Sequence, residues 1–397
     1  MNELLNELCG RFTLPQETMA AGIYPYYRPI SSGQDPEVQM TDGSQALMFG
    51  SNSYLGLSDD PRLKEAAIAA VQKYGTSCSG SRFLNGTLDI HEELERKLAK
   101  FVGMDKAVTF STGFQVNLGV VSALGFRGGY ILLDDTDHAC IIDGSRLSWS
   151  TVYKFKHNDM NALEKKLKAC EADKPKLIVV DGVYSMLGDL CPLPQICDLA
   201  EQYNAAVMID DAHGLGVFGE NGSGTASHFG LTDRVDLIMG TFSKSFGSLG
   251  GFIAGSEKVI NFLKHNSRSL IFSASMTPAA VAAASKALDL MIEEPQRREH
   301  LWDITRYAWK RFRDNGFDIN ATESPIIPLM VRDTIKALTI VRMAYDQGVF
   351  ITPVISPAVP EKDVLIRFAL MATHTKEHID IAVEKLTAIF KETGVIQ

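Results

Sequence analysis

Short, continuously apolar runs recur along the middle of this chain, and most of them are followed by a stretch with helical periodicity. Five such runs end in polar or glycine-rich turns: "KAVTFSTGFQ", "GYILLDDTDHA", "KLIVVDGVYSM", "AAVMIDDAH" and "VDLIMGTFSK". Strands that lack an alternating polar face are buried on both sides, which is typical of parallel strands covered by helices. The pattern therefore predicts an α/β fold with a mainly parallel sheet.

The chain of 397 residues is long enough for about two or three domain-sized units. We expect an N-terminal arm over residues 1–44, because the prolines and glycines of "GIYPYYRPISSGQDPE" prevent a continuing helix. The regular strand and helix pattern predicts a large domain over residues 45–285. After the helical stretch "PAAVAAASKALDLMIEE" helices and strands alternate again, which predicts a smaller α+β domain over residues 286–397.

The composition is that of an ordinary globular protein, and the formal net charge of -9 argues against a nucleic-acid partner. The start "MNELLNELCGRF" lacks the pattern of a secretory signal, and the sequence has no run of about 18 apolar residues, so we expect a cytoplasmic protein. The six scattered cysteines are expected to be free thiols. We expect no metal site, because paired C-x-x-C motifs are missing and His213 has no second histidine at helical spacing.

Polar residues cluster where the predicted strands end. In open parallel sheets, ligands bind beyond the carboxyl ends of the strands. Taken singly, each residue has an ordinary structural interpretation: Lys244 as a solvated charge, Asp210 as a helix cap or turn, and His138 and His213 as hydrogen-bonded histidines at the sheet edge. The polar segments are residues 111–114, 134–138, 181–185, 210–213 and 241–244.

Their combination at one sheet edge indicates a site for pyridoxal phosphate. A lysine amine can form a Schiff base with the cofactor aldehyde, and a carboxylate can pair with the pyridinium nitrogen. The helix start at "STGF" offers amide and hydroxyl donors to a phosphate. An imidazole can stack on the flat ring. Lys244 is therefore predicted to be the reactive amine of a site.

Seven longer strings carry a resemblance to a known family: "SNSYLGL", "GSRFLNGTLDIHEELE", "DHACIIDGSRLS", "DGVYSMLGD", "VMIDDAHGLGVFGENGSG", "GTFSKSFGSLGGF" and "FSASMTPA". Together they resemble the α-oxoamine synthases, from about residue 20 to the C-terminus. These are fold-type I pyridoxal phosphate enzymes, like aspartate aminotransferase in fold. Most members condense an amino acid with an acyl-CoA and release CoA and carbon dioxide. The resemblance also implies a homodimer with its sites at the subunit interface.

The resemblance implies a role for each matched cofactor residue. Lys244 would hold pyridoxal phosphate as a Schiff base, Asp210 would pair with the pyridinium nitrogen, His138 would stack on the ring, and His213 would bond the phenolic oxygen. Ser273 would reach across the dimer interface. The other residues assigned to the phosphate and its surroundings are Gly113, Phe114, Ser185, Thr241 and Ser243.

The substrate residues follow from the same resemblance. Arg367 would bind the amino-acid carboxylate, a task that suits a bidentate guanidinium. His138 would also contact that carboxylate, and Asn52 would line the substrate pocket. "GTFSKS", "SPAVP" and "IRFALMATHT" favour a member that uses L-serine and a long-chain acyl-CoA. A lipid product is compatible with peripheral contact with a membrane, although no basic amphipathic helix marks such contact.

Several alternatives stay open. Members that use glycine and acetyl-CoA share similar strings, and those that make 8-amino-7-oxononanoate or 5-aminolevulinate differ through pocket contacts that the sequence does not reveal. An aminotransferase or lyase would share Lys244 and Asp210 without needing the other strings. An inactive subunit would be expected to lose the lysine, which "SKS" retains. A pyridoxal-dependent transcription regulator would need a DNA-binding domain ahead of the fold.

Overall fold

A computed structural model describes residues 3–397 of the chain, which divide into two compact units. The first unit comprises Asn52–Trp302 and the short segment Glu323–Pro325. The second comprises the described part of Met1–Ser51 together with Asp303–Thr322 and Ile326–Gln397. The segment before residue 52 therefore packs with the C-terminal part of the chain. The expected division into residues 1–44, 45–285 and 286–397 stays a prediction about domains.

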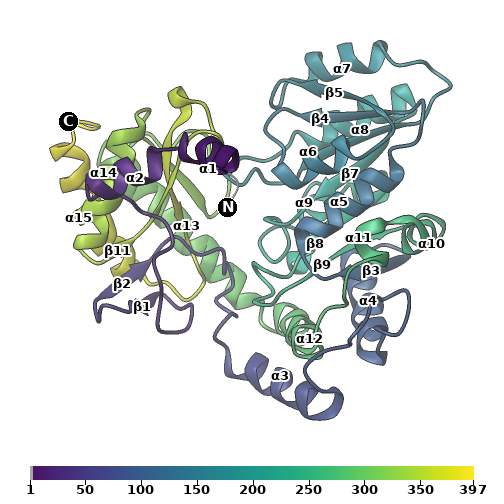
Figure 1. Ribbon diagram of the computed structural model, residues 1–397, viewed down its shortest axis with the longest axis horizontal. Helices are drawn as coiled ribbons and strands as arrows, with labels where there is room; N and C mark the ends of the chain where they lie inside the picture. Colours follow the sequence, from purple (N-terminus) through teal and green to yellow (C-terminus); the bar gives the residue numbers. More distant parts are fainter. Residues whose placement is uncertain (1–2) are drawn as a thin grey trace. The chain divides into compact units, whose positions relative to one another are not determined.

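The first unit is built on a seven-stranded sheet with the order β3-β9-β8-β7-β6-β4-β5 (Figure 1). Strand β9 is antiparallel to both neighbours, and β8, β7, β6, β4 and β5 pair in parallel. This confirms the predicted α/β fold with a mainly parallel sheet. The strands are β3 (Lys106–Phe110), β4 (Tyr130–Asp134), β5 (Thr151–Phe155), β6 (Lys176–Asp181), β7 (Ala206–Asp210), β8 (Leu237–Thr241) and β9 (Gly251–Gly255).

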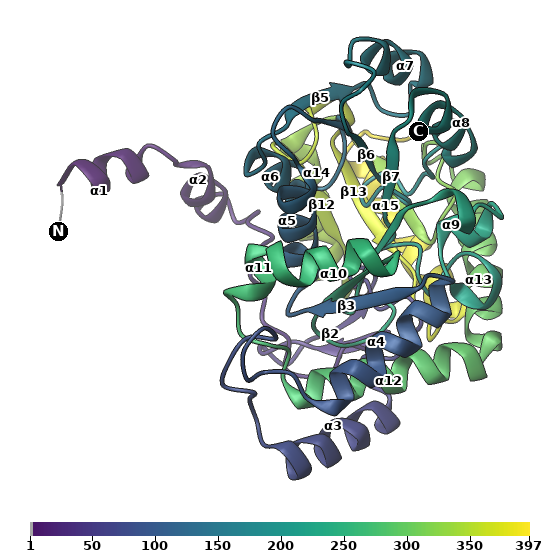
Figure 2. The same ribbon diagram turned by 90° about the vertical axis from the view of Figure 1, so that its right-hand side faces the viewer.

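Helices connect and cover these strands. They are α3 (Pro61–Tyr74), α4 (Asp89–Val102), α5 (Gly113–Leu124), α6 (Ala139–Arg146), α7 (Met160–Lys168), α8 (Leu193–Tyr203), α9 (Thr225–His228), α10 (Glu257–Asn266), α11 (Arg268–Ile271) and α12 (Pro278–Glu293). Two 3-10 turns lie at η1 (Glu220–Gly222) and η2 (Thr232–Arg234). Figure 2 shows α4 and α10 beside β3.

The buried core explains why polar and apolar residues do not alternate along these strands. Val108 of β3, Ile131 of β4 and Met239 of β8 belong to one buried cluster with Val116 and Val120 of α5. All residues of β6 and β8 are buried. Each fully buried aliphatic side chain contributes about 1.5–3 kcal/mol relative to exposure. The sheet is therefore a rigid support for the polar residues that follow its strands.

The second unit holds two small sheets. Strand β2 (Gln45–Met48) lies between β1 (Glu37–Gln39) and β11 (Val349–Phe350), antiparallel to the first and parallel to the second. Strand β13 (Leu365–Ala369) is antiparallel to both β10 (Ile326–Met330) and β12 (Thr352–Val354). The remaining elements are α1 (Glu3–Gly10), α2 (Leu14–Ala20), α14 (Thr334–Asp346), η3 (Glu361–Asp363) and α15 (Lys376–Glu392). Helix α13 (Pro295–Asp314) begins in the first unit and continues into the second from Asp303.

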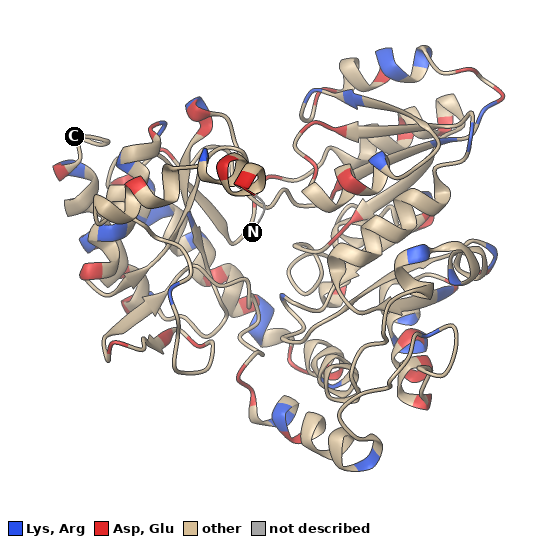
Figure 3. Cartoon of the chain, in the orientation of Figure 1, with Lys and Arg blue, Asp and Glu red and all other residues tan. Residues whose placement is uncertain are grey.

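Charged residues of both signs are interspersed over the elements of each unit, as Figure 3 shows. Among residues 3–397, every helix is too short or too polar to cross a lipid bilayer. The six cysteines are free thiols, as the sequence predicts.

Candidate active site

Strand register brings the predicted polar residues to one edge of the large sheet. Asp181 at the end of β6 lies opposite Asp210 at the end of β7. Thr241 at the end of β8 and Phe110 at the end of β3 both lie opposite Gly251. The turns that follow these strands therefore start from the same edge.

Asp210 is a buried carboxylate that two donors hold in place. Nδ2 of Asn117 lies 2.5 Å from its Oδ2, and the backbone N–H of Ala212 donates to its Oδ1 over 3.0 Å. Asp210 is 4% exposed and Asn117 is fully buried. The two donors fix the orientation of the Asp210 carboxylate at the end of β7.

His138 caps the N-terminus of α6. Its ring Nδ1 accepts a hydrogen bond from the backbone N–H of Cys140 over 3.3 Å. The backbone N–H of His138 donates to Oδ2 of Asp181 over 3.1 Å. Burial lowers the pKa of His138; the charge of Asp210 opposes this shift, and the charge of Lys244 adds to it. The lowered pKa of His138 favours the neutral imidazole, which suits stacking on a ring. Asp210 and Lys244 therefore both lie within electrostatic range of His138.

Lys244 lies in the tight turn that follows β8. Its side chain is half-buried, and its carbonyl accepts a hydrogen bond from the N–H of Gly247 over 3.0 Å. Gly247 has a φ of 55°, and a Cβ there would lie 2.9 Å from the backbone nitrogen of Ser58. Only glycine fits such a position without strain. The turn therefore holds Lys244 against a fixed piece of backbone.

His213 is bound to the "SNSYLGL" segment. Its Nδ1 lies 2.6 Å from the hydroxyl of Tyr54, and that hydroxyl lies 3.4 Å from Oδ1 of Asn52. Tyr54 is fully buried and His213 is 7% exposed. The contact fixes the ring of His213 and links it to Asn52, the residue predicted to line the substrate pocket.

The start of α5 forms a cradle for an anion. Thr112 caps the helix by accepting from the N–H of Gln115, and the first-turn N–H groups of Gly113 and Phe114 have no acceptor within the helix. A Cβ added to Gly113 would lie 2.6 Å from Oγ1 of Thr241, so the helix start and the end of β8 approach each other closely. Amide donors at a helix N-terminus favour a phosphate.

The hydroxyls predicted for the phosphate lie in three different segments. Oγ of Ser243 lies 3.0 Å from Oγ1 of Thr241. Oγ of Ser273 accepts a hydrogen bond from Nε2 of Gln115 over 3.1 Å, which places it beside α5 of its own chain. Ser185 is half-buried in the turn after β6. The expectation that Ser273 reaches across a dimer interface stays a prediction.

Together, these groups match the chemistry of pyridoxal phosphate. An amine, a buried carboxylate, two histidines and an N-terminal helix cradle gather at one sheet edge. A residue larger than glycine at 113 would clash with the hydroxyl of Thr241. The donor set therefore fits an aldehyde, a ring nitrogen and a phosphate dianion.

Arg367 belongs to the second unit and is not among the residues gathered at this edge. It lies in the middle of β13, opposite Pro328 of β10 and Thr352 of β12, and is 7% exposed. A buried guanidinium is costly unless anions or acceptors surround it. Its position is compatible with binding a carboxylate.

The sequence interpretation missed Asn117 and Tyr54, which hold Asp210 and His213. A signal for Asn117 was present, because this amide lies in the mainly apolar α5 four positions after Gly113. Residues four apart lie on one helix face, so the phosphate cradle and the Asp210 contact share a face of α5.

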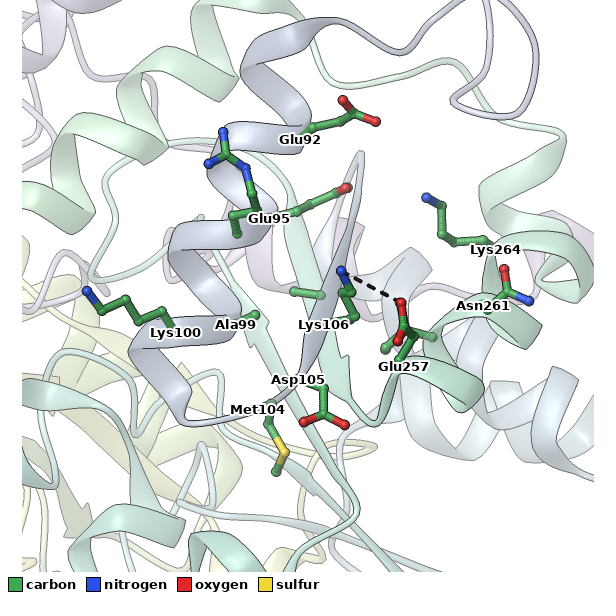
Figure 4. Close-up of a pocket in the computed structure, with 13 residues that line it drawn as sticks. Glu92, Glu95, Ala99, Lys100, Met104, Asp105, Lys106, Glu257, Asn261 and Lys264 are labelled. Carbon is green, nitrogen blue, oxygen red and sulfur yellow. Dashed lines mark ion pairs between the residues drawn. The ribbon is translucent and has the colours of Figure 1, made fainter.

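A separate surface pocket of about 540 Å³ lies at the other end of β3 (Figure 4). Its lining includes Lys106, the first residue of β3, which forms an ion pair with Glu257 over 3.8 Å. Acidic and basic side chains line it together. This pocket is distinct from the edge that carries Lys244.

Comparison with known proteins identifies the class. The family model "Aminotransferase class I and II" matches residues 44–386. The chain belongs to that family.

Relatives that match over nearly the whole chain identify a narrower family. A serine palmitoyltransferase of Sphingobacterium spiritivorum is 58% identical over 391 residues, covering 98% of both chains. Another from Bacteroides thetaiotaomicron is 59% identical, covering 99% of this chain and 100% of the relative. An 8-amino-7-oxononanoate synthase of Lysinibacillus sphaericus is 42% identical, covering 94% and 96%. Within its class, the chain belongs to the α-oxoamine synthases.

Solved structures agree with this assignment. Sphingomonas wittichii serine palmitoyltransferase superposes with a TM-score of 0.95 at 33% identity over all of both chains. A high-resolution serine palmitoyltransferase structure with pyridoxal phosphate gives 0.96 at 32%, again over all of both chains. The predicted fold-type I class is thereby confirmed.

Proposed function

We propose that the protein is a serine palmitoyltransferase. It condenses L-serine with palmitoyl-CoA and releases 3-ketodihydrosphingosine, CoA and carbon dioxide, the first step of sphingolipid synthesis. The observation that carries this proposal is the full-length identity of 58–59% to serine palmitoyltransferases. The identity to 8-amino-7-oxononanoate synthases is 40–42%. The protein is a pyridoxal-phosphate-dependent C-acyltransferase.

Pyridoxal phosphate, when bound, supplies a ring that withdraws electrons from the Cα of the amino acid. Lys244 would hold the cofactor through its amine. Asp210, whose carboxylate is held by Asn117, would face the ring nitrogen. His138 would stack on the ring, and His213 would hydrogen-bond the phenolic oxygen. The phosphate would be held by backbone N–H groups at the start of α5, those of Gly113 and Phe114. Hydroxyls would add to these donors, and they are assigned to Ser185, Thr241, Ser243 and Ser273.

Lys244 also moves the proton in the reaction. With serine in the site, the Lys244 Nζ would act as the base for the Cα–H proton. A general base must lie within hydrogen-bond reach of the proton that it removes, and a lysine that also holds the cofactor would be placed for this role. The new C–C bond joins Cα to the thioester carbon, the CoA thiolate leaves, and the carboxyl carbon departs as carbon dioxide. Lys244 then returns a proton to Cα.

The substrate is oriented by its carboxylate. Arg367 offers two parallel N–H donors to it, a geometry that lysine cannot reproduce. His138 contacts the same carboxylate, and Asn52 lines the pocket beside Tyr54 and His213. Orientation of the Cα–H bond follows from these contacts.

The assembly is proposed to be a homodimer in the cytoplasm. Large apolar side chains are exposed at Phe114 and Phe272, which are or adjoin residues assigned to the phosphate, and at Phe83 and Leu84. Such a set near a site favours coverage by another protein surface. Free thiols at all six cysteines suit a reducing compartment.

Release of the CoA thiol tests the function. Purified, cofactor-loaded protein is offered serine, glycine or alanine with palmitoyl-CoA or acetyl-CoA, and free thiol is measured against time. Thiol release that requires both serine and palmitoyl-CoA is expected. Release that requires glycine and acetyl-CoA instead would assign the chain to the glycine-using members, and release without an amino acid would indicate a hydrolase.

A further inference from the structure

His157 joins two carboxylates from different turns of the large unit. It follows β5, and its Nδ1 lies 3.0 Å from Oδ1 of Asp134, while its Nε2 lies 2.8 Å from Oδ2 of Asp189. A carboxylate only accepts, and a neutral imidazole carries one N–H, so both contacts together need the imidazolium. Burial pushes the pKa of His157 down, but the hydrogen bonds to Asp134 and Asp189 outweigh it and raise the pKa to about 10.

The first of these turns leads to His138. Asp134 ends β4, and its Oδ1 accepts from the N–H of Thr136 over 2.9 Å. The N–H of Asp137 donates to the carbonyl of Asp134 over 3.2 Å. The turn ends at His138, whose N–H donates to Asp181. Asp134 is fully buried, so its carboxylate depends on these donors and on His157.

The second turn carries Ser185. The N–H of Tyr184 donates to the carbonyl of Asp189 over 3.0 Å, which closes the turn around Ser185. The ring of His157 packs edge-on against Tyr184, with centroids 4.4 Å apart. Nδ2 of Asn158 donates to the same oxygen of Asp189 over 3.1 Å. His157 and Asn158 therefore both hold this turn through Asp189.

We propose that His157 is a positioning residue that fixes the turn of His138 against the turn of Ser185. Its imidazolium bridges the two turns and acts on the cofactor only through them. The spacing between the stacking imidazole and the Ser185 hydroxyl then depends on one charged bridge. This inference rests on the proposed cofactor site, because it deepens the roles given there to His138 and Ser185.

A double-mutant cycle on the bound cofactor tests the bridge. The variants are His157→Gln, Asp189→Asn and the two combined, and the readouts are pyridoxal phosphate affinity and circular dichroism in the cofactor's absorption band. Each single variant is expected to weaken cofactor affinity by roughly tenfold and to change the dichroic band. The double variant should lose no more than a single one, because both act through the same contact. Unchanged affinity and dichroism in the single variants, or losses that multiply to about 100-fold in the double variant, would overturn the proposal.

A second histidine provides the matched control. His378 of the second unit faces Glu37 over 3.6 Å and is remote in sequence from both turns. His378→Gln should leave cofactor affinity and dichroism unchanged; an equal loss there would show a general effect of destabilisation and refute the bridge. If His157→Gln does not fold, Asp189→Asn alone carries the test. These readouts need no substrate, so they are independent of which product the unaltered enzyme makes.

Discussion

Nδ2 of Asn117 lies 2.5 Å from Oδ2 of Asp210, and both side chains are buried. Asn117→Ala removes a donor from a buried carboxylate. Hydrogen bonds to charged groups contribute about 1.5–3 kcal/mol, so we expect a loss of that size in the free energy of unfolding. Pyridoxal phosphate affinity should fall as well, because Asp210 loses part of its fixed orientation. Urea unfolding and cofactor titration measure the two effects.

Asn261→Ala is a suitable control for this variant, because Asn261 is exposed on α10. Asn261→Ala should change neither the free energy of unfolding nor the free energy of cofactor binding by more than about 0.5 kcal/mol. An Asn117→Ala protein with unaltered cofactor affinity would contradict the role given to Asn117.

Lys244→Ala should leave the fold intact, since the side chain is only half-buried. The covalent link to the cofactor should disappear. Borohydride reduction followed by intact mass measurement detects that link as an added cofactor mass. Activity should fall by at least about 100-fold, the lower range for loss of a general acid or base.

Lys258→Ala controls for the loss of an ordinary lysine, because Lys258 is exposed on α10. It should keep both the added mass and the activity. If the Lys244→Ala protein still gained the cofactor mass after reduction, the link would belong to a different amine.

The stability of the large unit should depend on pH through His157. Its pKa is about 10 in the folded protein and 6.5 in the unfolded chain, so folding favours the protonated form. The stabilisation is fully present below pH 6.5 and is lost progressively as the pH rises through 10. Urea unfolding at pH 6, 8 and 10 should therefore show the difference between unaltered protein and His157→Gln shrinking as the pH rises.

That difference isolates His157 from other titrating groups, such as Asp211, whose pKa burial raises to about 7. Asp211 is present in both proteins and its contribution cancels. A difference that stays constant from pH 6 to 10 would show that folding does not raise the pKa of His157.

Arg367→Lys should raise the KM for serine by about 10- to 100-fold. The replaced guanidinium offers a bidentate pair of donors, and the loss of one charged hydrogen bond costs about 1.5–3 kcal/mol. Cofactor affinity should stay unchanged, because Arg367 lies on β13 in the second unit. Steady-state kinetics and cofactor titration separate the two quantities. A rise in KM for palmitoyl-CoA alone would place Arg367 at the acyl-CoA instead.

The sheet and much of the site could be predicted because continuous apolar runs mark buried parallel strands, and residues at their ends share one edge. The sequence interpretation did not identify β5 or β9 as strands. Strand β9 reads "GFIAG" and β5 is only partly buried, so neither has the apolar length that marked the others.

Side-chain contacts between residues distant in sequence could not be predicted from local sequence patterns either. Tyr54 and His213 are 159 residues apart, and His157 and Asp189 are 32 apart. Their contacts depend on strand order and on turn geometry. The residues proposed to perform chemistry stand out by type, whereas the residues that hold them are ordinary in type and are revealed only by the fold.

Product analysis with uniformly carbon-13-labelled serine and unlabelled palmitoyl-CoA tests the central claim most directly. The account predicts a long-chain amino ketone that retains two of the three serine carbons, with the third recovered as labelled carbon dioxide. A product that retains all three carbons, or the absence of a long-chain ketone from a protein fully loaded with pyridoxal phosphate, would contradict it.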